Sequence, residues 1–190
     1  MPTPTDVLEF WFAGDSQTHW YERDDAFDAA IRERFADTLD AARRGDLDHW
    51  AQTPHGWLAL LIVLDQFSRN LYRDDARAWS ADPMTQVLAL NGVARGDDQQ
   101  LTPMQRVFAY MPLEHAESPV LQGHCVQLFE RLVAGLLADE RPRFENFLDY
   151  ARRHHNVVER FGRFPHRNAV LGRLDTPEER EYLATPGSGF

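Results

Sequence analysis

The sequence contains no lysine, since all 20 of its basic residues are arginine. This absence excludes a lysine that forms a Schiff base and the lysine of a phosphate-binding loop. The sequence also contains a single cysteine, Cys125, so an internal disulfide framework is excluded. One cysteine is typical of a protein that stays in a reducing compartment, and we therefore expect a cytoplasmic location.

Long apolar runs are absent as well. The longest one, at 57–64, is far shorter than the roughly 20 residues that a membrane-spanning helix needs. The N-terminal residues lack the basic start and apolar stretch of a signal peptide. The net charge of −10 predicts that the chain does not bind nucleic acid. We expect neither a membrane nor a nucleic-acid partner.

Six residue pairs predict the starts of helices. In each pair a side chain that can cap a helix precedes a proline at the first helical position, where the missing N–H costs nothing. No segment shows the alternating pattern of a β-strand, so we predict an all-α chain. The pairs are Thr3-Pro4, Thr53-Pro54, Asp82-Pro83, Thr102-Pro103, Ser118-Pro119 and Thr176-Pro177.

Apolar residues between these starts recur at helical spacing. One stripe runs from Phe27 to Ala42 and ends near Gly45, and the apolar run 57–64 predicts a central helix covered on several sides. The short connections predict antiparallel helix pairs. No linker interrupts the chain, so we expect a single domain over 1–190 with an irregular tail at 185–190.

The most unusual segment is 152–173, which carries six arginines and three histidines but only one acid, Glu159. A buried guanidinium needs a partner, which is a carboxylate from elsewhere in the fold, an anionic ligand, or both. Planar guanidinium groups suit two-pronged binding of carboxylate or phosphate. The alternative is that these arginines bind the chain's own carboxylates and only lock the fold. The predicted ligand-binding residues of this segment are His155, Arg163, Arg167, Asn168 and Arg173.

A second group of polar residues directly follows the apolar run 57–64. Asp65 and Arg69 are four residues apart, so they share a helix face and can form an ion pair. Gln66 and Asn70 present amide groups on the neighbouring face. We predict that Asp65, Gln66 and Arg69 line the ligand site. A purely structural ion pair is the alternative.

A third group lies at 112–117, where Pro112 should prevent a helix from simply continuing. A histidine beside a carboxylate can act as a general base, because the carboxylate holds the imidazole tautomer and raises its basicity. We predict that His115, supported by Glu117, or else His166 performs any proton transfer. Whether a reaction is catalysed stays open, and His115 satisfying backbone groups is the alternative. No spacing matches a metal-ligand pattern, so we expect no metal and no cofactor.

Taken together, these segments resemble the uncharacterised, mostly bacterial family catalogued as domain of unknown function 924. The resemblance covers nearly the whole chain and is most specific over 161–173. It implies antiparallel helix pairs in a tetratricopeptide-like right-handed superhelix and brings no established activity. Ala116 stands where the family often has serine, which implies that a hydroxyl there is not a nucleophile. The segments that carry the resemblance are 10–12, 20–21, 45–50, 64–70, Pro112, 115–117, 163–168, 171–173 and 176–179.

These observations favour a soluble helical protein that binds a small anionic ligand, a carboxylate or a phosphate, in a buried site. Arg163, Arg167 and Arg69 would hold the anion, and Asn168 and Gln66 would orient it. The alternative is a scaffold that binds a peptide or protein in a concave groove, as tetratricopeptide-like superhelices do. The sequence does not indicate an oligomeric state.

Overall fold

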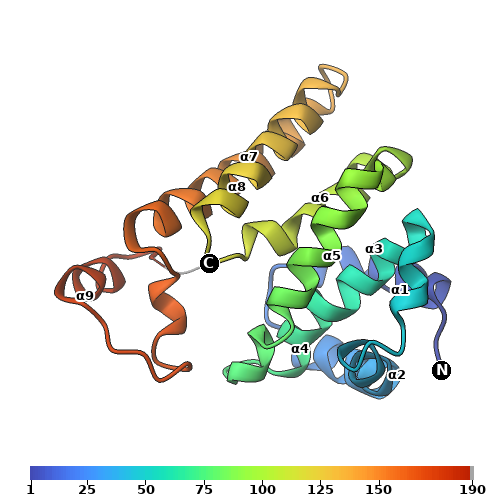
Figure 1. Ribbon diagram of the computed structural model, residues 1–190, viewed down its shortest axis with the longest axis horizontal. Coiled ribbons are helices and arrows are strands. Elements are labelled where there is room, and N and C mark those ends of the chain that lie inside the picture. Colours follow the sequence, from blue (N-terminus) through green and yellow to red (C-terminus); the bar gives the residue numbers. More distant parts are fainter. Residues whose placement is uncertain (189–190) are drawn as a thin grey trace. The chain divides into compact units, whose positions relative to one another are not determined.

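The computed structural model describes residues 1–188, and these residues are helical with short connections and no β-strand (Figure 1). The all-α prediction is therefore confirmed. Residues 185–188 form no helix, whereas the last two residues of the predicted tail lie outside the described residues. The helices are α1 (Pro4–Phe12), α2 (Asp25–Arg43), α3 (Pro54–Ile62), α4 (Ser68–Leu71), α5 (Asp82–Arg95), α6 (Pro103–Glu114), α7 (Pro119–Ala134), α8 (Arg141–Phe161) and α9 (Pro177–Leu183).

The chain forms two compact units. Unit 1 contains residues 1–73 and 77–112, and unit 2 contains residues 74–76 together with the chain from Leu113 onwards. Each unit is described by itself. The predictions of one domain over 1–190 and of a right-handed superhelix of helix pairs concern the whole chain and stay predictions. None of the helices in the described residues combines the length and hydropathy needed to cross a lipid bilayer.

Five of the six predicted helix starts are confirmed, at α1, α3, α6, α7 and α9. In α1 and α9 the caps are reciprocal, because Thr3 pairs with Asp6 and Thr176 pairs with Glu179. The exception is Asp82. It is the first residue inside α5 rather than the residue before it, and its carboxylate accepts hydrogen bonds from Arg69 instead of capping the helix.

The core of unit 1 forms around α3. Residues 57–64 are at most 1% exposed, which confirms the predicted central helix. Helices α1 and α5 pack against α3, and aromatic rings fill the space beside α2. Phe10 stacks on Phe27 with ring centroids 5.4 Å apart, and Trp11 meets Phe108 edge to face at 5.5 Å. The aromatic residues of the N-terminal segment therefore belong largely to the core.

The helix that begins as α3 widens after Ile62. Residues Val63–Phe67 form a single π-helical turn, η3, and α4 follows directly. A π-turn accommodates one additional residue within an α-helix and is frequent at functional sites. Asp65 and Gln66 lie in this turn, and both are buried.

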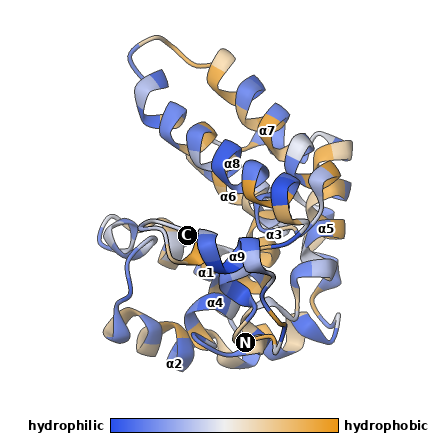
Figure 2. Cartoon of the chain, turned by 90° about the vertical axis from the view of Figure 1, so that its left-hand side faces the viewer, coloured by the Kyte–Doolittle hydropathy of each residue, from blue (hydrophilic) through white to orange (hydrophobic). Residues whose placement is uncertain are grey.

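Unit 2 is built on α7 and α8, which run antiparallel beside each other (Figure 1). Both helices carry alternating hydrophobic and hydrophilic patches in Figure 2, as amphipathic helices do. Helix α8 ends at Gly162, whose φ of 70° is the left-handed conformation that glycine adopts readily. A small core lies next to this end of α8. It consists of Val157, Val158 and Phe164, and Tyr182 of α9 packs against it.

The prediction that Pro112 separates two helices was wrong. Helix α6 passes through Pro112 and ends at Glu114. Proline removes one backbone hydrogen bond and kinks a helix, but within the last turn few further bonds depend on it. The irregular segment between α6 and α7 therefore contains His115 and Glu117, as expected, but begins after Glu114.

Candidate functional site

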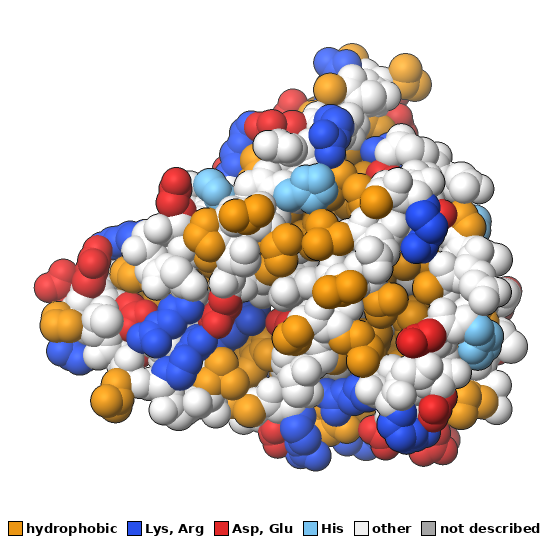
Figure 3. Space-filling view, viewed as in Figure 1, with side chains coloured by type: hydrophobic (Ala, Val, Ile, Leu, Met, Phe, Trp, Pro, Cys, Tyr) orange, Lys and Arg blue, Asp and Glu red, His pale blue; other side chains and the backbone are white. Residues whose placement is uncertain are grey.

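The predicted site residues are divided between the two units, and each group is described within its own unit. Unit 1 holds Asp65, Gln66 and Arg69. Unit 2 holds His115, Glu117, His155, Arg163, His166, Arg167, Asn168 and Arg173. On the face shown in Figure 3, basic side chains gather at the left of the view with acidic side chains beside them.

Arg69 is the centre of the group in unit 1. Its Nη1 lies 2.9 Å from Oδ1 of Asp65, as the spacing predicts, and its Nη2 donates to both carboxylate oxygens of Asp82. Gln66 donates from Nε2 to the other Asp65 oxygen at 2.5 Å and also lies 3.5 Å from the Met111 sulfur. These buried groups hold one another in place, which is the arrangement expected of a structural ion-pair network.

Glu117 and Arg173 form a two-pronged ion pair in unit 2. Arg173 donates from Nη1 to Oε2 at 2.6 Å and from Nη2 to Oε1 at 2.8 Å. The Phe164 backbone N–H also donates to Glu117, at 2.8 Å. Burial raises the pKa of Glu117, but the hydrogen bonds from Arg173 and Phe164 outweigh it, and the pKa lies below its ordinary value. The bonds of Glu117 within residues 1–188 thus run to Arg173 and Phe164, rather than to His115.

Arg163 forms a second two-pronged pair, with Glu179 of α9. Its Nε and Nη2 lie 2.6 and 2.8 Å from the two carboxylate oxygens, and Nη2 also donates to the Leu174 carbonyl at 2.9 Å. Glu179 is 2% exposed and accepts the Thr176 N–H as part of the helix cap. The bonds from Arg163 lower the pKa of Glu179 to about 2, although burial opposes the shift. This pair fastens α9 to the segment that follows α8.

The side chain of Asn168 lies between those of Arg173 and Asp175 and bonds to both. Its Nδ2 donates to Asp175 at 2.7 Å, and its Oδ1 accepts from Nε of Arg173 at 2.8 Å. Both ends of the buried amide therefore bond to protein groups, and Asn168 holds Arg173 in the orientation in which it meets Glu117.

A cluster of basic side chains surrounds the buried ring of Phe164. We call His115, His154, Phe164, His166 and Arg167 the Phe164 cluster. The Arg167 guanidinium lies 4.6 Å from the Phe164 ring centroid, and its Nη2 donates to the His115 carbonyl at 3.1 Å. The rings of His166 and His154 lie 5.5 and 5.6 Å from that of Phe164. The ring of His115 lies 6.3 Å from that of His154.

Two imidazoles of the Phe164 cluster have strongly lowered pKa values. Burial, followed by the charge of Arg167, lowers the pKa of His166 to about 4. Burial, followed by the proximity of His115, lowers the pKa of His154 to about 3, although the hydrogen bond between its Nδ1 and the Tyr150 carbonyl opposes this shift. Both rings are neutral at pH 7. Arg167 is only 6% exposed and supplies the permanent positive charge of the cluster.

Glu114 and Gln122 line the cluster on the α6–α7 side. A carboxylate oxygen of Glu114 lies 3.3 Å from Nδ1 of His154. The buried amide of Gln122 donates to the carbonyl oxygens of Glu114 and Ala116, which fixes the turn that carries His115. Cys125 is buried on α7, and burial raises the pKa of its thiol, as expected of an inert cysteine.

His154 and His155 occupy different environments although they are adjacent. His154 is buried against Phe164, whereas Nε2 of His155 faces α7, 3.8 Å from the point where a Cβ on Gly123 would lie. Successive residues on an α-helix point about 100° apart, so only one of the two can face the Phe164 cluster. In residues 1–188 no group of three or more His, Cys, Asp and Glu side chains is placed to hold a metal ion.

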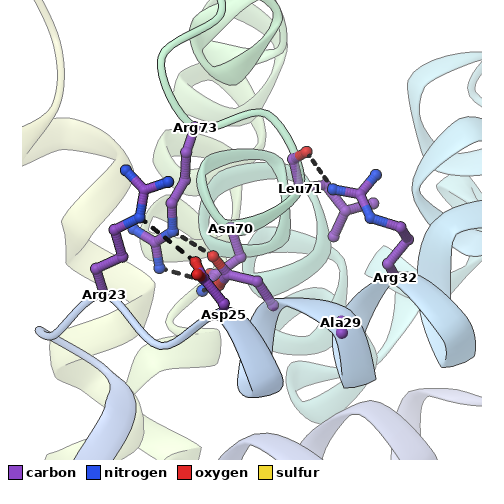
Figure 4. Close-up of a pocket in the computed structure, with 8 residues that line it drawn as sticks. Arg23, Asp25, Ala29, Arg32, Asn70, Leu71 and Arg73 are labelled. Carbon is purple, nitrogen blue, oxygen red and sulfur yellow. Dashed lines mark hydrogen bonds and ion pairs between the residues drawn. The ribbon is translucent and has the colours of Figure 1, made fainter.

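Unit 1 also contains a cleft that the sequence did not indicate (Figure 4). It has a volume of about 290 Å³ and lies between the start of α2 and the end of α4. Asp28 lies at its base, where it accepts hydrogen bonds from Nε and Nη2 of Arg73 and, at 2.8 Å, from the amide of Asn70. On the other side Arg32 donates to the Leu71 carbonyl at 2.9 Å.

The comparisons with known proteins identify the family but no activity. Residues 7–187 match the family described as bacterial protein of unknown function (DUF924). The chain belongs to the DUF924 family. A solved structure of a protein of unknown function from Agrobacterium tumefaciens is 38% identical to this DUF924 chain and superposes with a TM-score of 0.84. The match covers 95% of this chain and 96% of that chain. No curated protein matches the sequence.

The sequence therefore located the polar groups of this DUF924 protein better than their partners. It singled out the segment that contains Arg163, Arg167 and Arg173, but not Glu179 as a partner. Of the two adjacent histidines it predicted His155 as a ligand-binding residue, whereas His154 is the one that packs against Phe164. For the cleft in unit 1 the sequence offers only Asp28, beside the apolar stripe of α2, and an aspartate in that position does not by itself indicate a cleft. Since the family description names no activity, function has to be argued from the side chains themselves.

Proposed function

We propose that this DUF924 protein binds a small anionic ligand, a carboxylate or a phosphate, at the Phe164 cluster, and that it does so in the cytoplasm. The observation that carries the proposal is that Arg167, His154 and His166 pack around one buried aromatic ring, Phe164, while His115 lies beside His154. A buried guanidinium with imidazole N–H groups around it favours an anion, because charge-assisted hydrogen bonds are strongest where water is excluded.

The other arginines of the segment support Arg167 rather than contact the ligand. Arg163 and Arg173 are each bound in a two-pronged manner by a glutamate. They hold the backbone at 164–173 in the shape that presents Arg167 and His166. Asn168 acts through Arg173 in the same way. Asp65, Gln66 and Arg69 bond one another in unit 1 and are not needed for this proposal.

Ligand binding should be coupled to proton uptake. The charge of Arg167 is one of the causes that hold the pKa of His166 at about 4. A bound anion offsets that charge, so the pKa of His166 rises in the complex. Affinity should therefore increase as the pH falls through the pKa of the complex and level off below about pH 4. An imidazole can accept a proton at one nitrogen and donate one from the other, and His166 and His115 keep the role of proton transfer in the proposal.

The test is a thermal-shift screen with sulfate, phosphate and small carboxylates, followed by calorimetric titration of sulfate between pH 8 and pH 5. Sulfate keeps its charge over this range, so any pH dependence belongs to the protein. A ligand that binds only the folded state stabilises it by about 2.7 kcal/mol at a hundred times its dissociation constant. For a chain of this size that is a rise in melting temperature of roughly 5–10 °C.

Three variants decide the result. Arg167→Gln and His166→Gln should remove the shift, whereas Arg153→Gln should keep it, because Arg153 pairs with Asp149 on the exposed face of α8. A shift that persists in both Arg167→Gln and His166→Gln would contradict the proposal. So would an equal loss in Arg153→Gln, since that result indicates general charge attraction. His166→Gln provides the test should Arg167→Gln not fold.

The alternative function, a scaffold that binds a peptide or protein, has less support. It needs the aromatic residues 10–12 and Trp20 as an exposed groove wall. In unit 1 Trp11 is fully buried and lies 6.1 Å from Trp20, ring to ring. A ligand screen without any response would favour the scaffold, and a search for a protein partner would follow.

A further inference from the structure

We propose a second, independent binding site in the cleft of unit 1, which would take a small organic dianion with two carboxylates joined by a short carbon chain. Arg23, Arg32 and Arg73 line the cleft together with only two acids, Asp25 and Asp28. A local excess of positive charge is unexpected in a chain whose net charge is −10. The cleft contains none of the residues of the Phe164 cluster, so the two sites can be tested separately.

The positive groups stand at two ends of the cleft. Figure 4 shows Arg23 and Arg73 at one end and Arg32 at the other, with Ala29 and Leu71 between them. Arg32 follows Asp28, the partner of Arg73, by one helical turn, which is a rise of about 6 Å along α2. Two separated cations with apolar groups between them match a ligand that has an acidic group at each end and carbon in the middle.

Asp28 does not cancel this attraction. Its carboxylate is buried and takes two hydrogen bonds from Arg73 and one from Asn70. The two bonds from Arg73 use its Nε and Nη2 atoms, so the Nη1 atom of the guanidinium can donate to a ligand. Because Asp28 and Asn70 hold the guanidinium in a fixed orientation, little side-chain entropy is lost when an anion binds there.

Arg32, at the other end, is exposed and held less firmly than Arg73. Its one bond within the described residues runs from Nη2 to the Leu71 carbonyl, which leaves Nε and Nη1. The remaining acid, Asp25, is 88% exposed and lies 3.5 Å from Arg23, so this surface pair contributes little. The cleft volume of about 290 Å³ is at the small end of ligand sites, which suits a short dicarboxylate.

The experiment compares succinate with acetate at low ionic strength, because salt screens exposed charges. Binding is followed by NMR through the backbone amide of Ala29, which reports on the middle of the cleft. We expect succinate to bind at least about tenfold more tightly than acetate, since only succinate can reach both ends. Equal affinities would overturn the proposal.

Three substitutions sharpen the comparison. Arg32→Gln should weaken succinate binding about tenfold, because a charge-assisted contact is lost, and should leave acetate binding largely unchanged. Asp25→Asn should strengthen succinate binding about twofold by removing a nearby like charge. Arg44→Gln, which removes an arginine from an exposed pair with Asp46, is the matched control and should change neither affinity. Wild-type affinity in Arg32→Gln, or an equal loss in Arg44→Gln, would overturn the proposal.

The two proposed sites give distinguishable results. The response of Ala29 to succinate should persist in Arg167→Gln, because the cleft contains no residue of the Phe164 cluster. Succinate that also binds at the Phe164 cluster would shift the ring signals of His166, and only that second response should disappear in Arg167→Gln. Loss of the Ala29 response in Arg167→Gln would overturn an independent site in unit 1, whatever the outcome of the sulfate titration.

Discussion

Arg69 donates hydrogen bonds to both carboxylate oxygens of Asp82, at 3.2 and 3.1 Å, while its other terminal nitrogen lies 2.9 Å from Asp65. One guanidinium thus joins the π-turn to the start of α5. The same bonds explain why Asp82 does not cap the helix. A buried carboxylate gains more from charge-assisted bonds to arginine than from one bond to a backbone N–H.

Replacement of Arg69 should therefore destabilise the protein strongly. Arg69→Met removes the cation shared by two buried carboxylates and should lower the free energy of unfolding by about 3–5 kcal/mol. Urea denaturation measures this loss. Arg153→Met removes an exposed pair with Asp149 and should cost less than about 1 kcal/mol. Equal, small losses in the two variants would show that the Arg69 network contributes little.

The Arg163–Glu179 pair predicts a specific dependence of stability on pH. The pKa of Glu179 falls from an ordinary 4.5 to about 2 in the folded protein. Its contribution is therefore fully present above pH 4.5 and is lost as the pH falls towards 2. Glu179→Gln should be clearly less stable than the wild type at pH 6, and the difference should shrink between pH 4.5 and pH 3. Urea denaturation of both proteins across this range checks the prediction. Glu145→Gln, an exposed change on α8, should show no such trend.

The half-buried imidazole of His166 predicts a loss of stability at higher pH values than Glu179 does. The pKa of His166 is lowered from 6.5 to about 4 on folding, so the unfolded chain binds a proton that the folded chain does not. Its contribution is complete above pH 6.5 and decreases as the pH falls towards 4. His166→Gln should flatten the decline in unfolding free energy between pH 7 and pH 5. His49→Gln, at an exposed position, should leave the slope as it is. An unchanged slope in His166→Gln as well would contradict the lowered pKa of His166.

Two glycine-to-alanine substitutions should have opposite effects. A Cβ on Gly92 of α5 would lie 2.1 Å from the ring of Trp57, which is fully buried and donates to the Leu88 carbonyl. Gly92→Ala should destabilise by about 1–3 kcal/mol through overpacking. On Gly123 of α7 the Cβ would meet only His155, at an ordinary 3.8 Å. Gly123→Ala should stabilise by about 0.5–1 kcal/mol, because alanine favours the helix. Denaturation midpoints check both signs, and a neutral Gly92→Ala would contradict the contact between α3 and α5.

The helices could be predicted because their signals are local. Thr3 and Thr176 cap helices through bonds to residues three positions away, and the apolar run 57–64 needs no distant partner to indicate burial. The π-turn had no such signal, since its extra residue is accommodated by packing rather than by a residue type. Asp82 shows the limit of a local rule, because a side chain 13 positions earlier in the chain decides its role.

The candidate site could be predicted only as a concentration of charge. The composition of segment 152–173 indicates that its basic groups need anionic partners. It does not indicate that Glu117 is the partner of Arg173, because the two residues are 56 positions apart in the chain. Judged by residue type alone, several other acidic residues could have been the partner of Arg173. In the same way, Asp28 and Arg73 are 45 residues apart, and neither position suggests the other. Which of two adjacent histidines turns inward depends on the rotational phase of α8, and the sequence pattern does not resolve that phase.

The π-turn at Val63–Phe67 holds one more residue than an α-helical turn would. The turn absorbs this extra residue, so the side chains of α4 keep the rotational phase that α3 sets. Deleting one residue from the turn would restore a continuous α-helix, and Arg69 would still face Asp82 and Asn70 would still face Asp28. Inserting a further residue would instead turn the following side chains by about 100° and disconnect both of these polar networks at once. The segment should therefore tolerate a single-codon deletion better than a single-codon insertion.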